Sequence, residues 1–135
     1  MTTMKTKLYT VAMFVGLAAA SAPATAQCKI EVAKKAHAFD QIDTACKATH
    51  RLTEKGKLLF TIAAGMVYAE SDNGDACMKE AEAAFMGLMV SPDMIEAAQR
   101  RDKKKVMALM CDSTAVYLNA LKLDGDNPMV EEQSK

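Results

Sequence analysis

The sequence predicts an all-α protein, a small disulfide-stapled bundle of four to five helices. The 135-residue chain has no tryptophan and few other aromatic residues, and it lacks alternating runs of β-branched residues. Apolar residues recur instead at helical spacing between residues 29 and 122. Its four cysteines, an even number in so short a chain, indicate a disulfide framework.

Residues 1–26 have the pattern of a cleaved secretory signal peptide. Lys5 and Lys7 precede an apolar run from residue 8 to about residue 20, and Ala24-Thr25-Ala26 offers a cleavage site of small residues. We therefore expect a periplasmic or secreted bacterial protein that begins at Gln27 and has no transmembrane anchor in its mature chain. A lipoprotein is disfavoured because Gln27, before Cys28, is not a small residue.

The mature chain predicts a single helical domain over residues 27–123 and a flexible tail over residues 124–135. Loss of Lys5 and Lys7 leaves the mature chain with a small negative charge. A near-neutral balance gives no reason to expect a nucleic-acid partner.

The first two predicted helices span residues 29–49 and residues 58–69. The second is the most apolar stretch after the signal peptide, with Thr53 as its N-cap and the turn-forming residues 71–74 as its end. Its large side chains are spread around the helix, so we expect it to lie buried at the centre of the bundle.

The remaining predicted helices follow clear start signals. Asp75 is the expected N-cap of a helix over residues 76–90, and Ser91-Pro92 predicts a short helix that ends near Arg100. The apolar pattern then lapses, which predicts a break with Asp102 as the N-cap of a last helix over residues 103–122. One continuous helix over residues 92–122 is the alternative.

The helix order restricts how the cysteines can pair. Cys28 and Cys46 are placed on one helix about 27 Å apart, at 1.5 Å per residue, which is too far for a disulfide. In an up-and-down bundle Cys28 lies near Cys77, and Cys46 lies near Cys111. This predicts Cys28–Cys77 and Cys46–Cys111. The pairing of Cys28 with Cys111 and Cys46 with Cys77 becomes better if residues 92–122 are one helix.

Metal binding through methionine is a weaker hypothesis. Thioethers bind Cu(I), and two pairs at i, i+3 spacing could present sulfur atoms from one helix each: Met86 with Met89, and Met107 with Met110. Methionine more often fills gaps in a core. We expect all four to be core residues, with no metal and no cofactor.

The sequence contains no recognisable catalytic motif. Its two histidines, His37 and His50, are 13 residues apart and point in different directions if they share a helix. The most concentrated charge is a basic run that could meet an anionic partner, formed by Arg100, Arg101, Lys103, Lys104 and Lys105. A solvated helix junction is the simpler interpretation of that run.

These observations favour a non-enzymatic protein of the bacterial envelope that acts through protein–protein interaction, such as an inhibitor, an immunity factor, an assembly accessory or a chaperone. A methionine-lined binder of copper or of a small apolar ligand is the first alternative. An enzyme with an unrecognised site is the second.

Overall fold

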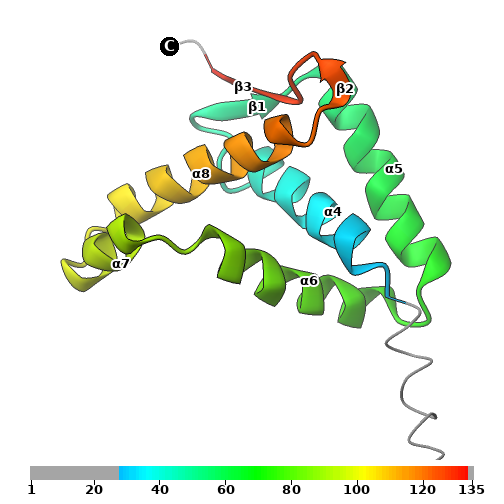
Figure 1. Cartoon of the computed structure of the whole chain (residues 1–135), viewed down its shortest axis with the longest axis horizontal. Coiled ribbons are helices and arrows are strands. Elements are labelled where there is room, and N and C mark those ends of the chain that lie inside the picture. Colours follow the sequence, from blue (N-terminus) through cyan, green and yellow to red (C-terminus); the bar gives the residue numbers. More distant parts are fainter. Residues whose placement is uncertain (1–27, 134–135) are drawn as a thin grey trace, which may run out of the picture.

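The computed structural model of the chain describes residues 28–133. The predicted signal peptide lies outside these residues. The described part is a helical bundle stapled by two disulfides, as predicted (Figure 1). Its helices are α4 (Ile30–Asp43), α5 (Glu54–Glu70), α6 (Gly74–Met89), α7 (Pro92–Gln99) and α8 (Lys103–Ala120). Its strands are β1 (His50–Leu52), β2 (Leu123–Asp126) and β3 (Val130–Glu132).

Side-chain caps define where four of the helices begin. Thr53, Ser91 and Asp102 accept backbone N–H bonds at the starts of α5, α7 and α8, as predicted. The helix α6 begins earlier than expected, because Asn73 rather than Asp75 is its N-cap and accepts a bond from Ala76 N at 3.1 Å. The Asp75 carboxylate then lies in the first turn, where it still complements the helix dipole.

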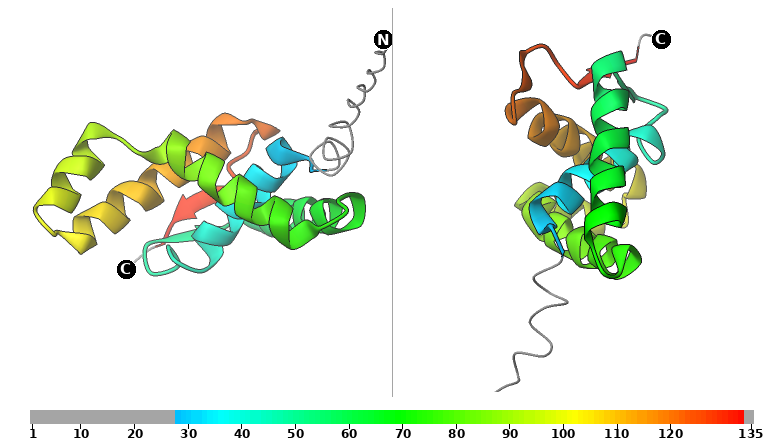
Figure 2. Two further views of the ribbon diagram at one scale, coloured as in Figure 1. Left: turned by 90° about the horizontal axis from the view of Figure 1, so that it is seen from below. Right: turned by 90° about the vertical axis from the view of Figure 1, so that its right-hand side faces the viewer.

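The central helix of the bundle is α4, which packs against α5, α6, α8 and β1 (Figures 1 and 2). It is shorter than predicted, since turns replace its last residues and carry Cys46 toward α8. Buried residues lie on all sides of α4, at Ala33, Ala36, His37, Ala38, Phe39 and Ile42. The expectation that residues 58–69 form the buried centre is therefore wrong.

Two hydrophobic clusters lie along α4, and each contains one disulfide. The cluster near the start of α4 is rich in alanine, which brings α5 and α6 close, and contains Cys77. Cys77 is bonded to Cys28 with a Cα–Cα distance of 5.4 Å. The larger cluster contains Phe39, Phe85 and Leu118, together with the Cys46–Cys111 bridge at 5.6 Å between Cα atoms. Both predicted disulfides are confirmed.

The break between α7 and α8 is also confirmed, and it excludes one continuous helix over residues 92–122. Arg101 has a φ of 60°, a left-handed conformation that ends a helix. Its N–H donates to Ala98 O, and the Asp102 side chain then caps α8. The two helices pack against each other as a hairpin at one end of the molecule (Figure 2).

Residues 123–133 are folded, which corrects the prediction of a flexible tail for the described part of residues 124–135. Strand β3 pairs antiparallel with β1, with His50 opposite Glu132 and Leu52 opposite Val130. Met129 and Val130 are buried in the larger cluster. The side chain of Asn119 on α8 holds this segment, because its Oδ1 accepts from Met129 N at 2.8 Å and Val130 N at 3.1 Å, and its Nδ2 donates to Val130 O at 3.1 Å.

Candidate interaction surface on helix α5

The inward face of α5 carries small residues. Gly56, Ala63 and Val67 are its buried positions, and Ala63 and Val67 pack in the alanine-rich cluster with α4. A Cβ on Gly56 would overlap the carbonyl oxygen of Met129, so the absence of a side chain there lets the C-terminal segment approach. The helix therefore sits tightly on the bundle while burying few of its large side chains.

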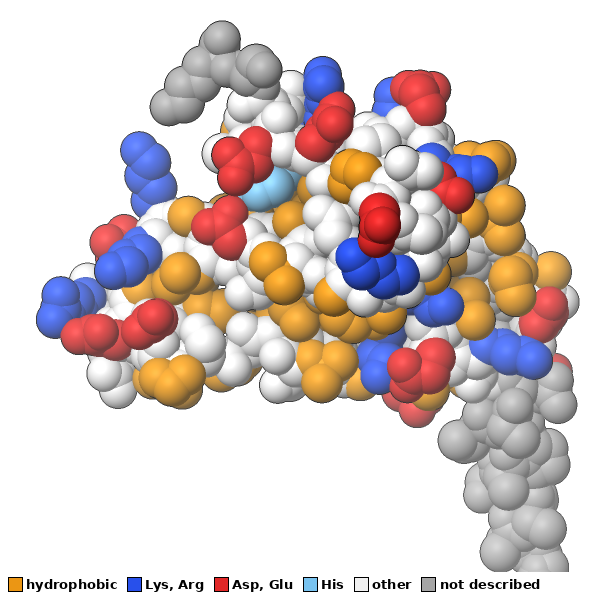
Figure 3. Space-filling view, turned by 45° about the horizontal axis from the view of Figure 1, so that its top comes forward, with side chains coloured by type: hydrophobic (Ala, Val, Ile, Leu, Met, Phe, Trp, Pro, Cys, Tyr) orange, Lys and Arg blue, Asp and Glu red, His pale blue; other side chains and the backbone are white. Residues whose placement is uncertain are grey.

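The outward face of α5 carries large apolar side chains that the other described residues cover only in part. Leu58, Ile62 and Met66 follow one another at i, i+4 and i+8, and their exposed fractions are 52%, 47% and 36%. This spacing places all three on one side of the helix, and we call them the α5 stripe. Hydrophobic side chains gather along that side of the molecule (Figure 3).

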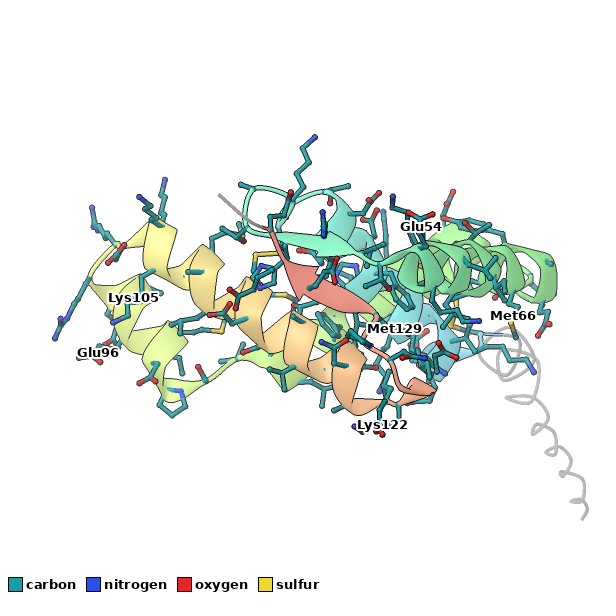
Figure 4. The ribbon with its side chains drawn as sticks, turned by 90° about the horizontal axis from the view of Figure 1, so that it is seen from above. Glu54, Met66, Glu96, Lys105, Lys122 and Met129 are labelled. Atoms are coloured by element: carbon teal, nitrogen blue, oxygen red, sulfur yellow. A yellow bond between two sulfur atoms is a disulfide. The ribbon has the colours of Figure 1, made fainter. Side chains whose placement is uncertain are left out.

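A shallow apolar hollow of about 160 Å³ lies beside the α5 stripe. It runs between α4 and α5 and reaches β2. Its lining consists of Val32, Lys35, Phe39, Leu59, Ile62, Ala63, Met66 and Leu123. The stripe and the hollow share Ile62 and Met66, so together they form one apolar surface with Lys35 as its charged member. Met66 marks its far end, and Glu54 lies at the other end of α5 (Figure 4).

The four candidate methionines are not all core residues, which corrects the prediction. Met110 is buried and Met89 packs against the larger cluster, as expected. Met86 and Met107 are 37% and 46% exposed, although each lies only about 60° around its helix from its partner. Among the described residues, no group of three or more His, Cys, Asp or Glu side chains could hold a metal ion.

The structure places His50 beside Asp112, a pairing that the sequence does not reveal. His50 is buried, and its Nε2 lies 3.3 Å from Asp112 Oδ1, while its Nδ1 lies 2.8 Å from Thr49 Oγ1. The two residues border an open hollow of about 660 Å³ between α8 and β3. Both ring nitrogens are engaged, so the arrangement fixes the imidazole next to the Cys46–Cys111 bridge.

His37 takes no part in this pair and lies in the core instead. Only 7% of it is exposed, and its ring meets the Phe85 ring edge-on at a centroid distance of 5.3 Å. Burial lowers the pKa of His37 below the ordinary value of 6.5, and the negative charges of Glu82 and Asp40 offset only part of that effect. The folded protein therefore favours the neutral imidazole.

We expect acid to destabilise the protein through His37. The unfolded chain takes up a proton as pH falls through 6.5, whereas the folded chain resists it, so stability is complete above this value and declines below it. One such group contributes a slope of at most about 1.4 kcal/mol per pH unit. Urea unfolding at a series of pH values below 6.5 gives the free energy of unfolding against pH. This free energy should fall less steeply with falling pH for His37→Gln than for the wild type. Equal slopes would contradict this assignment.

The predicted basic run lies at the junction of α7 and α8, and all five of its side chains are exposed. Arg100 pairs with Glu96 at 2.8 Å between Nη2 and Oε2. The junction and the α5 stripe lie at opposite ends of the molecule (Figure 4). The structure thus does not bring the basic run and the apolar surface together.

No family model matches the chain, and no match is found among curated proteins or solved structures. The class of protein is therefore given by the structure of this chain alone: it is a small helical bundle with two disulfides. Disulfides of this kind fit an oxidising environment. None of the helices between residues 28 and 133 is both long and apolar enough to cross a membrane.

Proposed function

We propose that the protein is a non-enzymatic interaction protein of the bacterial envelope, periplasmic or secreted, which binds an apolar segment of another envelope protein on α5. The observation that carries the proposal is the exposure of Leu58, Ile62 and Met66 in one row. Three large apolar side chains held in water cost free energy that a partner would recover by covering them. The signal-peptide pattern of residues 1–26 supports the envelope location.

The shape of the surface supports an extended apolar partner segment, such as a helix face. The stripe is a ridge, and the hollow of about 160 Å³ beside it offers a place for one inserted side chain. Partner helices that lie in a groove present apolar anchors at the same i, i+4 spacing. The apolar lining is largely aliphatic, with Lys35 at its border, which favours a partner with an acidic flank.

Ile62→Glu tests the proposal because Ile62 belongs to both the stripe and the hollow. The matched control is Thr61→Glu, which adds the same charge at the neighbouring exposed position, about 100° around the helix. Capture from an envelope extract, using the mature oxidised protein, should recover one partner with the wild type and with Thr61→Glu but not with Ile62→Glu. We expect both variants to unfold within about 0.5 kcal/mol of the wild type.

Two results would contradict the proposal. One is the recovery of the same proteins with all three baits. The other is a wild-type dimer in sedimentation that Ile62→Glu dissociates, because the surface would then be occupied by a second copy of this chain.

A further inference from the structure

The tip of the α7–α8 hairpin, residues 98–107, holds the densest run of basic residues between residues 28 and 133. It carries five basic side chains and one acidic one. The acidic residue is Asp102, whose carboxylate is engaged as the cap of α8. Among the described residues, Glu96 pairs with Arg100, whereas no carboxylate lies within 4 Å of the other four cations, Arg101, Lys103, Lys104 and Lys105.

Apolar surface lies directly beside these cations. Met107 is 46% exposed. It borders a hollow of about 620 Å³, whose other lining residues are Ala98, Arg101, Asp102, Lys103 and Val106. Lysine and arginine beside exposed aliphatic groups are the composition of surfaces that rest in a lipid headgroup layer. Basic side chains project from this end of the molecule (Figure 3).

The rest of the protein has the opposite charge. Residues 28–97 and 108–133 together carry nine basic and sixteen acidic side chains. An anionic surface therefore attracts the tip and repels the body, which selects one orientation in which the hairpin points at the surface. A single acidic protein would satisfy the cations as well, but it gives no reason for Met107 to be exposed among them.

We propose that the α7–α8 tip docks on an anionic phospholipid bilayer, with the basic side chains among the headgroups and Met107 at the level of the first acyl carbons. This inference goes beyond the proposed binding of a partner on α5. In this orientation the α5 stripe lies at the far end of the molecule and stays accessible (Figures 1 and 4). Its test does not depend on any partner protein.

Flotation with vesicles measures the docking. The mature protein should partition onto vesicles of equal parts phosphatidylglycerol and phosphatidylcholine, not onto phosphatidylcholine alone, and salt should weaken the binding. Each basic side chain near such a surface contributes roughly a fivefold gain in partitioning. The double variant Lys103→Ala with Lys104→Ala should therefore bind roughly 25-fold more weakly. Lys55→Ala with Lys57→Ala changes the net charge equally on α5 and should keep wild-type partitioning.

A tryptophan reporter tests the depth of the tip, because the chain has no tryptophan of its own. The emission of Met107→Trp should shift to the blue on the anionic vesicles. Val116→Trp is the control, since Val116 is 67% exposed on the same helix but nine residues away from Met107, and its emission should not shift. Three results would each overturn the proposal. The wild type does not bind the anionic vesicles, the two lysine double variants lose partitioning equally, or the emission of the two tryptophan reporters shifts equally.

Discussion

Removal of the Cys46–Cys111 disulfide is expected to lower the free energy of unfolding by about 4 kcal/mol. The bridge spans a sequence separation of 65 residues, and closing so long a loop restricts the unfolded chain strongly. Both cysteines are also buried in the larger cluster. Denaturant unfolding of the double variant Cys46→Ala with Cys111→Ala measures this loss. Thermal unfolding should show a melting temperature at least about 10 °C below that of the wild type.

The second bridge provides the control for this prediction. A reductant should lower the melting temperature of that double variant further, because Cys28–Cys77 still closes a separation of 49 residues. A variant without any of the four cysteines should not respond to the reductant. If full reduction of the wild type leaves its melting temperature unchanged, the bridges do not stabilise the fold as inferred.

The second large effect is expected from Gly56→Ala, with Gly65→Ala as its matched control on the same helix. A Cβ at Gly56 overlaps the backbone of Met129, so the C-terminal segment must shift or detach from α5. Overpacking of this kind costs about 1–3 kcal/mol. A Cβ at Gly65 meets nothing within 4 Å, so the alanine there should stabilise the protein by about 0.5–1 kcal/mol.

The two glycine variants therefore change stability in opposite directions, which chemical unfolding can measure directly. Amide exchange should in addition show faster exchange of Thr53 N–H in Gly56→Ala, since this group donates to Met129 O. Stabilisation by both alanines would mean that the C-terminal segment does not pack on Gly56.

The cysteine pairing could be predicted from the sequence because helix geometry excludes one pairing, and the break before residue 103 favours one of the other two. Cys28 and Cys46 cannot meet along one helix, and Ser91-Pro92 and Asp102 mark the turns that reverse the chain. Those local signals determine which ends of the helices meet. The start of α6 differed from the prediction by a few residues, since Asn73 and Asp75 are both good caps.

The burial of α5 could not be predicted, because apolar composition does not say which molecule covers a side chain. The stretch is the most apolar of the mature chain, yet α4, with several small residues and Phe39, is the helix that the others surround. A helix that is apolar nearly all round suits the centre of a bundle. It suits equally well a helix with one face on its own domain and another on a partner.

The C-terminal strand and the His50–Asp112 pair were missed for a different reason. Strands β1 and β3 have three residues each, which is too short for a recognisable alternation. Their pairing depends on Asn119, whose side-chain amide bonds the backbone of β3. His50 reaches Asp112 only after this ribbon and the adjacent disulfide bring β1 to α8.

The pairing of β1 with β3 also sets an order of events as the chain emerges, N-terminus first, into the compartment where it folds. A chain that emerges from its N-terminus has Cys28, Cys77 and the three helices α4, α5 and α6 available early, so the alanine-rich cluster and its disulfide can form first. The larger cluster must wait, because Met129 and Val130 belong to it and follow all its other buried members in the chain. Until they arrive, β1 has no strand partner and Cys46 depends on the late arrival of Cys111. The larger cluster thus stays incomplete until residues 129 and 130 have joined the rest of the domain.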